Sequence, residues 1–421
     1  MVSRLGYTLL LYALLPRILL HPLLRARRQR SYLRHFWERF GAYRTAARGP
    51  YIWVHAVSVG ETRAAEPLVL ALQQAYPQYR ILLTHMTPTG RTASEQLFGD
   101  QVERCYLPYD FPFAVRRFLD YFKPVLGVLM ETEIWFNLIH QCARRRVPIY
   151  LANARMSDKS SRKYAKFPTL TRASLQELSA IAAQTESDAE RLKRLGAPAP
   201  AVAVTGSLKF DIVPSPAMIE QGIAWRVHFG SARRVWLAAS TRGGEEQLLL
   251  DALERIEVAG LLLVIVPRHP QRFDEVAQLL ASRGLRYQRK TGGLDVEAGT
   301  EVLLGDSMGE MFAYCAASDV AFVGGSLLPY GAHNFLEPCA VGKPVLVGPS
   351  TYNFADAARM AIAAGALIQV ADAAELAAEV ARLLIDAAAA AAMGRAALEF
   401  SRQHQGATQR LMQMLHFDPG A

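Results

Sequence analysis

Short apolar runs alternate with helical stretches along most of this chain, in two successive series, and this pattern constrains the fold more than any other feature. Alternating strands and helices predict parallel sheets, because each helical crossover returns the chain to the same edge of the sheet. The strand candidates of the first series are 51–57, 80–85, 125–130, 147–151, 180–184 and 201–205. Those of the second series are 235–239, 261–266, 302–304, 320–323, 344–347 and 366–370.

The length of 421 residues is more than one ordinary core holds, and the stretch 209–234 separates the two series. That stretch loses periodicity and carries Pro214 and Pro216, as a linker does. We therefore expect an α/β protein with two doubly wound, Rossmann-like domains facing a cleft. The expected divisions are an N-terminal segment 1–48, a first domain 49–208, the linker 209–234 and a second domain 235–421 with closing helices.

The net charge of +9 is concentrated at one end, because residues 1–50 hold ten arginines and one acidic residue. The balanced charge elsewhere argues against a nucleic-acid partner. An apolar stretch, 5–24, lies beside the arginines and predicts a membrane-associated helix, either a marginal span or a helix in the interface. The alternative is an ordinary core helix. The arginines that follow, expected to face an anionic membrane surface, are Arg25, Arg27, Arg28, Arg30 and Arg34.

The four cysteines are widely spaced, and neither they nor the ten histidines show a metal-ligand spacing. We expect four small buried side chains and no metal.

A glycine-rich run follows the strand candidate 320–323 and leads into a helical pattern near His333. Glycines such as Gly325, followed by Ser326, allow close backbone approach, and N–H groups at a helix start attract anions. Glu337, one turn further, is placed to hold a ribose hydroxyl. The run therefore predicts a nucleotide site at the carboxyl ends of the strands.

Other strand ends of the second series carry glycine, hydroxyl or arginine groups in the same way. Arg268 follows Pro267 and is presented rigidly, which suits a phosphate. Met308, Gly309 and Glu310 follow the next strand, and the loop 240–245 follows the first. Because the carboxyl ends of parallel strands share one edge, these loops favour a nucleotide site over coincidence.

Three residues of the first series leave alternatives open. Glu61 fits a general base at a strand tip, but Ser58-x-x-Glu61 is also a capping box, which the spacing alone favours. Glu131 and Glu133 follow a strand and repel each other unless a cation faces them, or serve only as acids at a helix start. Lys209 either reaches the predicted cleft or is a solvated lysine.

These residues together resemble the 3-deoxy-D-manno-octulosonic acid (Kdo) transferases of lipid A assembly. The resemblance covers nearly the whole chain and is carried by HAVSVGE (55–61), ETEIW (131–135), TGSLKFD (205–211), PRHP (267–270), GDSMGE (305–310) and FVGGSLLPYGAHNFLEP (322–338). It implies a GT-B glycosyltransferase fold, a CMP-Kdo donor with no further cofactor, a lipid A precursor as acceptor, and metal-free inversion at the anomeric carbon.

The resemblance also implies roles. Glu61 matches the general base, and Glu131 and Lys209 match residues that stabilise the transition state. We expect both to act at the sugar, with Lys209 holding its carboxylate. The positions that fall on the CMP-binding motifs are Pro267, Arg268, Met308, Gly309, Glu310, Asn334 and Glu337, with Gly325, Ser326, Phe335 and Leu336 in the same glycine-rich run. This chain departs from the pattern at Arg242-Gly243, where His-Glu is expected, and at Ala332 and Phe335, where Gly and Pro are usual.

A Kdo transferase of this kind is expected on the cytoplasmic side of the inner membrane, anchored by its N-terminal helix. Two alternatives remain: a GT-B enzyme that uses a UDP-sugar and a lipid acceptor, and a membrane-bound sugar-nucleotide sensor without turnover.

Overall fold

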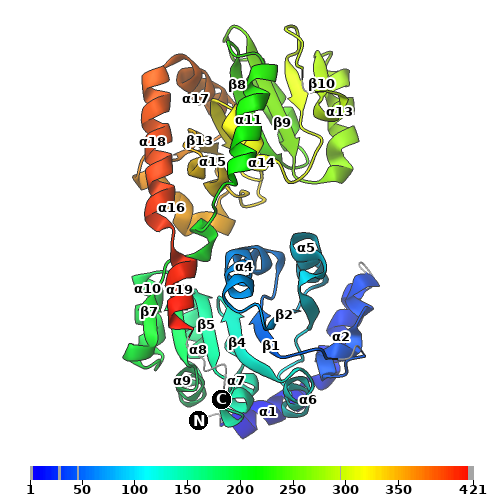
Figure 1. Cartoon of the computed structure of the whole chain (residues 1–421), viewed down its shortest axis with the longest axis vertical. Helices are drawn as coiled ribbons and strands as arrows, with labels where there is room; N and C mark the ends of the chain where they lie inside the picture. Colours follow the sequence, from blue (N-terminus) through cyan, green and yellow to red (C-terminus); the bar gives the residue numbers. More distant parts are fainter. Residues whose placement is uncertain (1–2, 27–29, 45–46, 294, 416–421) are drawn as a thin grey trace. The chain divides into compact units, whose positions relative to one another are not determined.

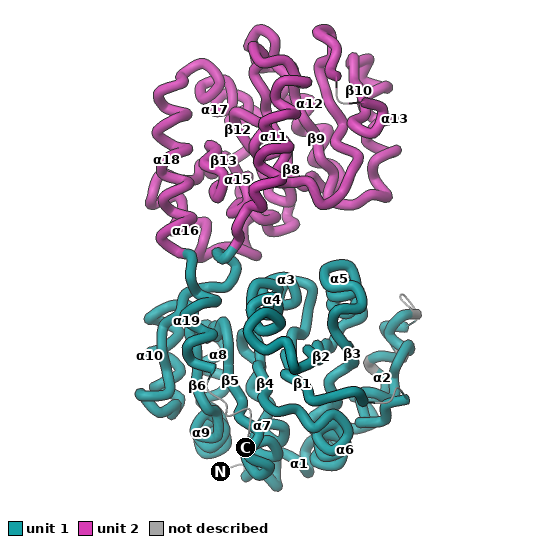
Figure 2. Tube along the Cα trace, viewed as in Figure 1, with its two compact units in different colours: residues 1–211, 405–421 teal, residues 212–404 magenta. Residues whose placement is uncertain are grey.

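The computed structural model describes the chain apart from residues 1–2, 27–29, 45–46, 294 and 416–421. The chain forms two compact units (Figure 2): unit 1 consists of residues 1–211 and 405–421, and unit 2 of residues 212–404. Each unit is built on a seven-stranded sheet in which every pairing is parallel (Figure 1). The predicted pair of doubly wound domains is confirmed.

The sheet of unit 1 has the order β3-β2-β1-β4-β5-β6-β7. The strand β1 is buried on both faces: Tyr51 and Trp53 belong to one core, and Ile52 and Val54 to the other. Burial on both faces explains why the strands read as continuous apolar runs. The strands are β1 (Tyr51–His55), β2 (Arg80–His85), β3 (Glu103–Tyr106), β4 (Pro124–Met130), β5 (Ile149–Ala154), β6 (Ala180–Ala183) and β7 (Val202–Val204).

In unit 1 the helical segment that follows the first strand is divided in two. The break falls at Ala65, and Pro67 starts the second helix, where its missing N–H costs nothing. The helices are α1 (Arg4–Ala13), α2 (Leu15–Ala26), α3 (Val59–Ala64), α4 (Glu66–Ala75), α5 (Pro88–Phe98), α6 (Pro112–Phe122), α7 (Phe136–Arg144), α8 (Asp158–Tyr164), α9 (Pro168–Gln176), α10 (Glu186–Arg194) and α19 (Ala407–Met414).

Unit 2 has the sheet order β10-β11-β9-β8-β12-β13-β14. Its strands are β8 (Arg234–Thr241), β9 (Leu261–Pro267), β10 (Tyr287–Arg289), β11 (Val302–Leu304), β12 (Val320–Val323), β13 (Val345–Val347) and β14 (Ile368–Gln369). Its helices are α11 (Pro216–His228), α12 (Glu245–Leu253), α13 (Phe273–Ser282), α14 (Met311–Ala317), α15 (Leu336–Ala340), α16 (Ala355–Ala363), α17 (Ala373–Ile385) and α18 (Ala387–His404).

In both sheets the order in which strands are added reverses beside the first strand of the unit. In unit 1 the chain leaves β1 toward β2 on one side and later returns to pair β4 on the other; in unit 2, β8 has β9 on one side and β12 on the other. Such a switch point opens a crevice at the carboxyl ends of the strands, where open α/β sheets bind ligands. The loops after β1, β4, β8 and β12 are therefore the places to look for chemistry.

All twelve predicted strands are present, but two further strands, β3 and β10, were not predicted. β3 begins with Glu103 and Arg104, and β10 is Tyr-Gln-Arg. Both lie at the edge of a sheet, where a strand pairs with one neighbour only, and both carry polar residues in place of a continuous apolar run.

The predicted linker 209–234 is wrong as an irregular segment, because it contains α11, which packs against α14 in unit 2. A side chain at Gly222 would lie 2.5 Å from the carbonyl oxygen of Ala313, so the two helices approach closely. The buried side of α11 is small, with Gly222 and Trp225, whereas Ile223 and Val227 are exposed. Because two large apolar side chains of α11 are exposed and a glycine is buried, the helix has no apolar face that the sequence pattern could reveal.

The predicted second domain, 235–421, ends too late. α19 packs against α4 of unit 1 and buries Ala407 and Leu411 in the core there. Asp211 fixes this return of the chain, since its carboxylate accepts hydrogen bonds from the N–H groups of Gly406, Ala407 and Thr408. A helical pattern shows that a segment is a helix, not which of two cores it covers.

At the N-terminus, α1 lies on unit 1 through polar side chains. Arg4 pairs with Glu177 at 3.0 Å, Tyr7 donates to Asp110, and Thr8 is hydrogen-bonded to Asn137. Within the described residues no single helix is long and apolar enough to cross a membrane; α1 and α2 reach that size only as a pair bent by 54°. Arg27 and Arg28 lie outside the described residues.

Candidate active site

The switch point of unit 1 carries three carboxylates. Glu61 lies in the first turn of α3, directly after β1, and Glu131 and Glu133 follow β4. The carboxylate of Glu61 turns back to accept hydrogen bonds from the N–H of Val57 at 2.9 Å and from the hydroxyl of Ser58 at 3.1 Å.

The predicted capping box is half formed. Glu61 satisfies a backbone N–H, but Ser58 donates to Glu61 and makes no cap bond of its own to the helix. Capping therefore accounts for only one of the contacts of Glu61 and does not exclude a chemical role.

The site raises the pKa of Glu61 from 4.5 to about 8. Burial is the main cause; the negative charges of Glu131 and Glu133 add to it, and the hydrogen bonds from Val57 and Ser58 oppose it. A carboxyl with a pKa near neutral pH is suited to accept a proton during a reaction.

Glu131 has a strained backbone and a cationic neighbour. Its φ is +56°, a left-handed conformation that side chains with a Cβ rarely adopt and that tends to mark functional sites. Lys209 places its Nζ 3.9 Å from Oε1 of Glu131. Asn153 holds this lysine segment, because its Oδ1 accepts the N–H of Leu208 at 3.1 Å. The structure thus brings Glu131 and Lys209 together, as the resemblance implied.

Glu133 faces a buried histidine. Nε2 of His55 lies 3.9 Å from Oε2 of Glu133 and is buried without a hydrogen-bond partner, while Nδ1 lies 2.8 Å from the hydroxyl of Thr84. Burial lowers the pKa of His55 to about 3, so its ring is neutral. The indole of Trp135 donates to Glu133 at 2.5 Å, and burial raises the pKa of that carboxyl.

Unit 2 presents the predicted nucleotide loops at the carboxyl ends of its strands. Pro267 ends β9, and the N–H of Arg268 donates to the carbonyl of Thr241 at 3.0 Å, which joins the ends of β9 and β8. Met308 has half of its side chain exposed (50 %), and Gly309 turns the chain at a φ of +84°.

Glu310 is neutralised by its surroundings. Lys290 contacts both carboxylate oxygens at 2.9 and 2.8 Å, and Ser307 also donates to them. Burial alone raises the pKa of Glu310, but these donors outweigh it and hold the pKa below 4.5. α14 begins at Met311, directly after Glu310.

The glycine-rich turn after β12 is bound internally. The buried carboxylate of Glu245 accepts hydrogen bonds from the N–H groups of Gly325, Ser326 and Leu327 at 2.6–3.0 Å. Ser326 is itself fully buried and donates to the carbonyl of Val323. In this structure Gly325 and Ser326 therefore shape the turn, and their N–H groups are occupied by Glu245 rather than presented to a ligand.

Glycine is required where the turn meets the loop after β8. A side chain at Gly324 would lie 2.7 Å from the carbonyl oxygen of Ser240 and from the Cα of Thr241. The two loops at the switch point are therefore in backbone contact.

Further along the same run, Asn334 and Glu337 are half-buried and joined by a hydrogen bond of 3.2 Å. Phe335 and Leu336 are buried, so their side chains belong to the core. α15 begins at Leu336, later than the start expected near His333. Ala332 has a φ of +61°, which explains why glycine suits this position, and Phe335 has a φ of −78°, which proline also adopts.

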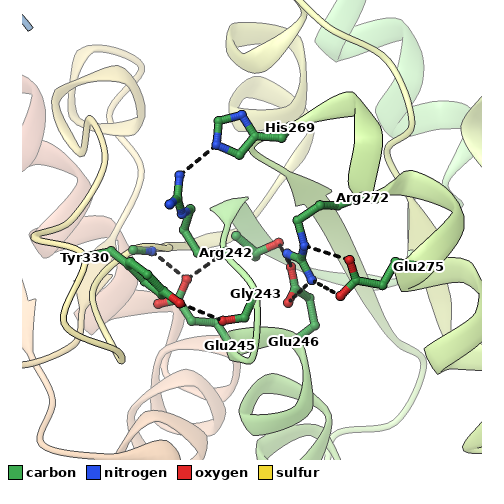
Figure 3. A network of polar contacts seen from close by, with 10 residues as sticks. Arg242, Gly243, Glu245, Glu246, His269, Arg272, Glu275 and Tyr330 are labelled. Carbon is green, nitrogen blue, oxygen red and sulfur yellow. Dashed lines mark hydrogen bonds and ion pairs between the residues drawn. The ribbon is translucent and has the colours of Figure 1, made fainter. Parts of the chain in front are cut away.

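Arg242 lies at the end of β8 and was noted in the sequence only as a departure from the family pattern. Figure 3 shows its guanidinium directed toward His269, with Nη1 2.7 Å from Nε2, and stacked at 4.8 Å over the ring of Tyr330. The sequence did not indicate Lys290, and it placed Arg242 and Glu245 in the first strand-end loop of unit 2 without assigning either a role.

In the described part of the chain, no group of three or more His, Cys, Asp or Glu side chains is arranged to hold a metal ion. All four cysteines are buried, as predicted.

Comparisons with known proteins agree with this architecture. The family described as 3-deoxy-D-manno-octulosonic-acid transferase matches residues 34–212, and the group 1 glycosyl transferases match residues 247–400. A UDP-GlcNAc 2-epimerase from Neisseria meningitidis shares the fold, with a TM-score of 0.57 and 16 % identity over 86 % of this chain and 99 % of its own. The two parallel-sheet units thus define a protein of the GT-B glycosyltransferase class.

Two relatives of known family identify the family within this class. A 3-deoxy-D-manno-octulosonic acid transferase from Bordetella pertussis is 44 % identical over 97 % of this chain and 98 % of its own, and one from Haemophilus influenzae is 39 % identical over 98 % of both. The chain belongs to the 3-deoxy-D-manno-octulosonic acid transferase family, and it is a glycosyltransferase that transfers Kdo in lipopolysaccharide biosynthesis.

Proposed function

We propose that this enzyme transfers Kdo from CMP-Kdo to the lipid A precursor tetraacyldisaccharide 4′-phosphate and releases CMP, with inversion at the anomeric carbon. The observation that carries this proposal is Glu61, a half-buried carboxyl at a switch point whose pKa of about 8 suits a general base. Glu61 takes the proton of the acceptor hydroxyl, whose oxygen forms a bond to the anomeric carbon. The bond from that carbon to the phosphate oxygen breaks, and its electron pair leaves with CMP.

The donor is proposed to bind unit 2. Arg268 suits the phosphate, because a guanidinium forms strong charge-assisted hydrogen bonds to its oxygens. The exposed side chain of Met308 offers an apolar surface to the cytosine base, beside Gly309, Glu310 and Pro267. Asn334 and Glu337, already hydrogen-bonded to each other, are suited to the ribose hydroxyls.

Glu131 and Lys209 are proposed to act at the sugar. The carboxylate of Glu131 stabilises positive charge that develops at the anomeric carbon as CMP departs. Lys209, 3.9 Å away, compensates the charge of Glu131 among the three acidic side chains. The strained backbone of Glu131 supports this role, because such conformations are retained where the side chain must point in one direction.

We further propose that the transfer needs no metal, since Arg268 supplies positive charge at the leaving group. Turnover that continues in EDTA is the expected result. Loss of turnover in EDTA that Mg²⁺ restores would contradict this part of the proposal.

The N-terminal helices are proposed to lie in the cytoplasmic face of the inner membrane. α1 contacts unit 1 with polar side chains, whereas Leu5 and Leu9 are 69 % and 60 % exposed, and Arg17, Arg25 and Arg34 are also exposed. An apolar outer face beside arginines fits an anionic lipid surface.

Vesicle binding tests this placement. Leu5→Ser with Leu9→Ser should weaken binding to all vesicles, and Arg25→Gln with Arg34→Gln should remove about 1 kcal/mol per arginine on anionic vesicles only. Leu70→Ser on α4, half-exposed (50 %), is the matched control. Unchanged binding in both double variants would rule out the membrane surface.

The experiment that tests the reaction is mass spectrometry of lipids formed by the purified protein, the precursor and freshly prepared CMP-Kdo. A product enlarged by one or more Kdo residues, with CMP formed in equal amount, is expected. Product only with a UDP-sugar, or CMP-Kdo binding without product, would overturn the proposal.

A further inference from the structure

Arg242 is a positive charge at the switch point of unit 2 that the protein does not neutralise. Among the residues that the structure describes, no carboxylate lies within ion-pair distance of Arg242. Neighbouring arginines differ: Arg272 pairs with Glu246 at 2.5 Å and with Glu275 at 3.0 Å (Figure 3). The two carboxylates at the start of α12, Glu245 and Glu246, accept hydrogen bonds from other donors.

The guanidinium is held in place by neutral groups. Its Nη1 donates to Nε2 of His269 at 2.7 Å, which requires that nitrogen to be unprotonated, and its face stacks on Tyr330 at 4.8 Å. The hydroxyl of Tyr330 in turn donates to the carbonyl of Gly243 at 3.2 Å. These contacts fix the orientation of the Arg242 guanidinium without cancelling its charge. An anion that binds there finds its hydrogen-bond donors already oriented.

The backbone under Arg242 is equally constrained. Ser240 has a φ of +55°, and the N–H of Arg242 donates to Glu245 at 2.9 Å. The left-handed backbone of Ser240 costs free energy that a solvated arginine would not require. Backbone strain of this kind is found most often at ligand sites.

Arg242 also lies next to the proposed phosphate ligand in the sheet. Thr241 pairs with Pro267, so Arg242 and Arg268 follow paired residues of β8 and β9, strands that run about 4.8 Å apart. A nucleotide-activated 2-ulosonic acid carries two anions on one carbon, because its anomeric carbon bears both the phosphate ester and the carboxylate. Two arginines on adjacent strand ends match that arrangement.

We propose that Arg242 binds the carboxylate of the donor sugar and so selects a 2-ulosonic acid nucleotide over a neutral sugar nucleotide. This inference rests on the donor assigned in the proposed function. Arg242 suits the carboxylate better than Lys209 does, because Lys209 already faces Glu131 at 3.9 Å. Tyr330 acts as a positioning residue that holds the guanidinium of Arg242.

Binding to three ligands tests the assignment in the full-length protein without acceptor. Cytidine has no anion, CMP has the phosphate alone, and freshly prepared CMP-Kdo has the phosphate and the carboxylate. Arg242→Gln should weaken CMP-Kdo binding at least about tenfold, the low end for a hydrogen bond to a charged group, and change the binding of CMP and cytidine less than about threefold. Arg268→Ala should weaken CMP and CMP-Kdo together.

Two controls separate this role from a structural one. Arg234→Gln changes an exposed arginine at the opposite end of the same strand, and it should bind all three ligands as the wild type does. Tyr330→Leu removes the stacking face and should weaken CMP-Kdo severalfold, again sparing CMP. Arg242→Lys keeps the positive charge but not the planar guanidinium, so it should bind CMP-Kdo more tightly than Arg242→Gln and less tightly than the wild type.

The inference is overturned if Arg242→Gln binds CMP-Kdo normally, or if it loses CMP and CMP-Kdo equally, as a phosphate ligand would. Both outcomes leave the proposed function intact when the wild-type protein still makes the Kdo lipid. A wild-type protein that does not use CMP-Kdo refutes the proposed function, and the inference with it.

Discussion

The two units have the same architecture, but their switch points carry opposite electrostatics. In unit 1, Glu61, Glu131 and Glu133 lie close enough that the charges of the last two raise the pKa of the first, and Lys209 faces Glu131. In unit 2 the carboxylates are satisfied by their own donors, Glu246 by Arg272 and Glu310 by Lys290, and Arg242 is left as a cation.

The difference shows that the sheet supplies a position and the loops supply the chemistry. Burial and the neighbouring negative charges raise the pKa of Glu61, which favours proton transfer. A cation held by His269 and Tyr330 favours binding of an anionic donor instead. One fold used twice thus carries clustered carboxylates at one switch point and a cation at the other.

The largest expected effect is on the unit 1 side. Glu61→Gln should lower turnover by roughly two or more orders of magnitude, the usual contribution of a general base. CMP binding, assigned to unit 2, should not change, as measured by fluorescence titration. The control Glu66→Gln removes a carboxyl in the next helix and should keep full turnover; equal loss in both variants would contradict a specific base.

The matching change in unit 2 is Arg268→Ala. It should weaken CMP binding by about 1.5–3 kcal/mol, the range for a hydrogen bond to a charged group, and should change cytidine binding much less. Calorimetric titration with the two ligands measures the difference. Equal losses for CMP and cytidine would place Arg268 away from the phosphate.

The crowding of unit 1 predicts a pH dependence. Because Glu61 must be ionised to accept a proton and its pKa is about 8, kcat/KM should rise about tenfold per pH unit below pH 8 and level off above it. Glu133→Gln removes one of the like charges, so the rise should shift to lower pH while burial keeps it above 4.5. A profile that Glu133→Gln leaves in place would mean that the charge of Glu133 does not contribute to the pKa of Glu61.

The same shift affects stability with a definite sign. A carboxyl whose pKa is raised on folding stabilises the protein below pH 4.5, and this contribution is lost as the pH rises through about 8. The melting temperature of Glu61→Gln should therefore lie above that of the wild type at pH 9 and approach it at pH 5.

The smallest expected effect concerns strain in unit 2. Ala332→Gly relieves a left-handed backbone worth about 1–2 kcal/mol but loses a buried methyl group and adds chain entropy to the unfolded state, so the free energy of unfolding should change by less than about 0.5 kcal/mol. Ala377→Gly, equally buried but inside α17, should cost about 1.5–2 kcal/mol. Equal losses in calorimetric scans would show that Ala332 is not strained.

The sequence predicted the buried strands because burial on both faces leaves an uninterrupted apolar run. It missed β3 and β10 because edge strands carry polar residues, and it missed α11 because Ile223 and Val227 point outward. These misses share a cause: the pattern of a segment reflects what covers it, which only the tertiary structure decides.

For the candidate site, the sequence likewise predicted the positions of individual residues but not their long-range partners. Strand-end motifs located Glu61, Glu131 and Arg268, and the structure joins Glu131 to Lys209, 78 residues along the chain. No local pattern indicates that Glu245 binds the N–H groups of Gly325 and Ser326 some 80 residues later. Long-range partners of this kind decide which groups remain available to a ligand.

The return of α19 to unit 1 affects how the protein is made. Ala407, Leu411 and Leu415 are buried in a core that otherwise consists of residues before 212, so unit 1 lacks part of its interior until residue 415 has been translated. Unit 2 has no such dependence, since its residues form one continuous stretch, 212–404. The usual order on the ribosome, in which the N-terminal domain is completed first, is therefore reversed in this protein. A premature stop codon after residue 404 would leave unit 2 whole and damage the unit that carries Glu61.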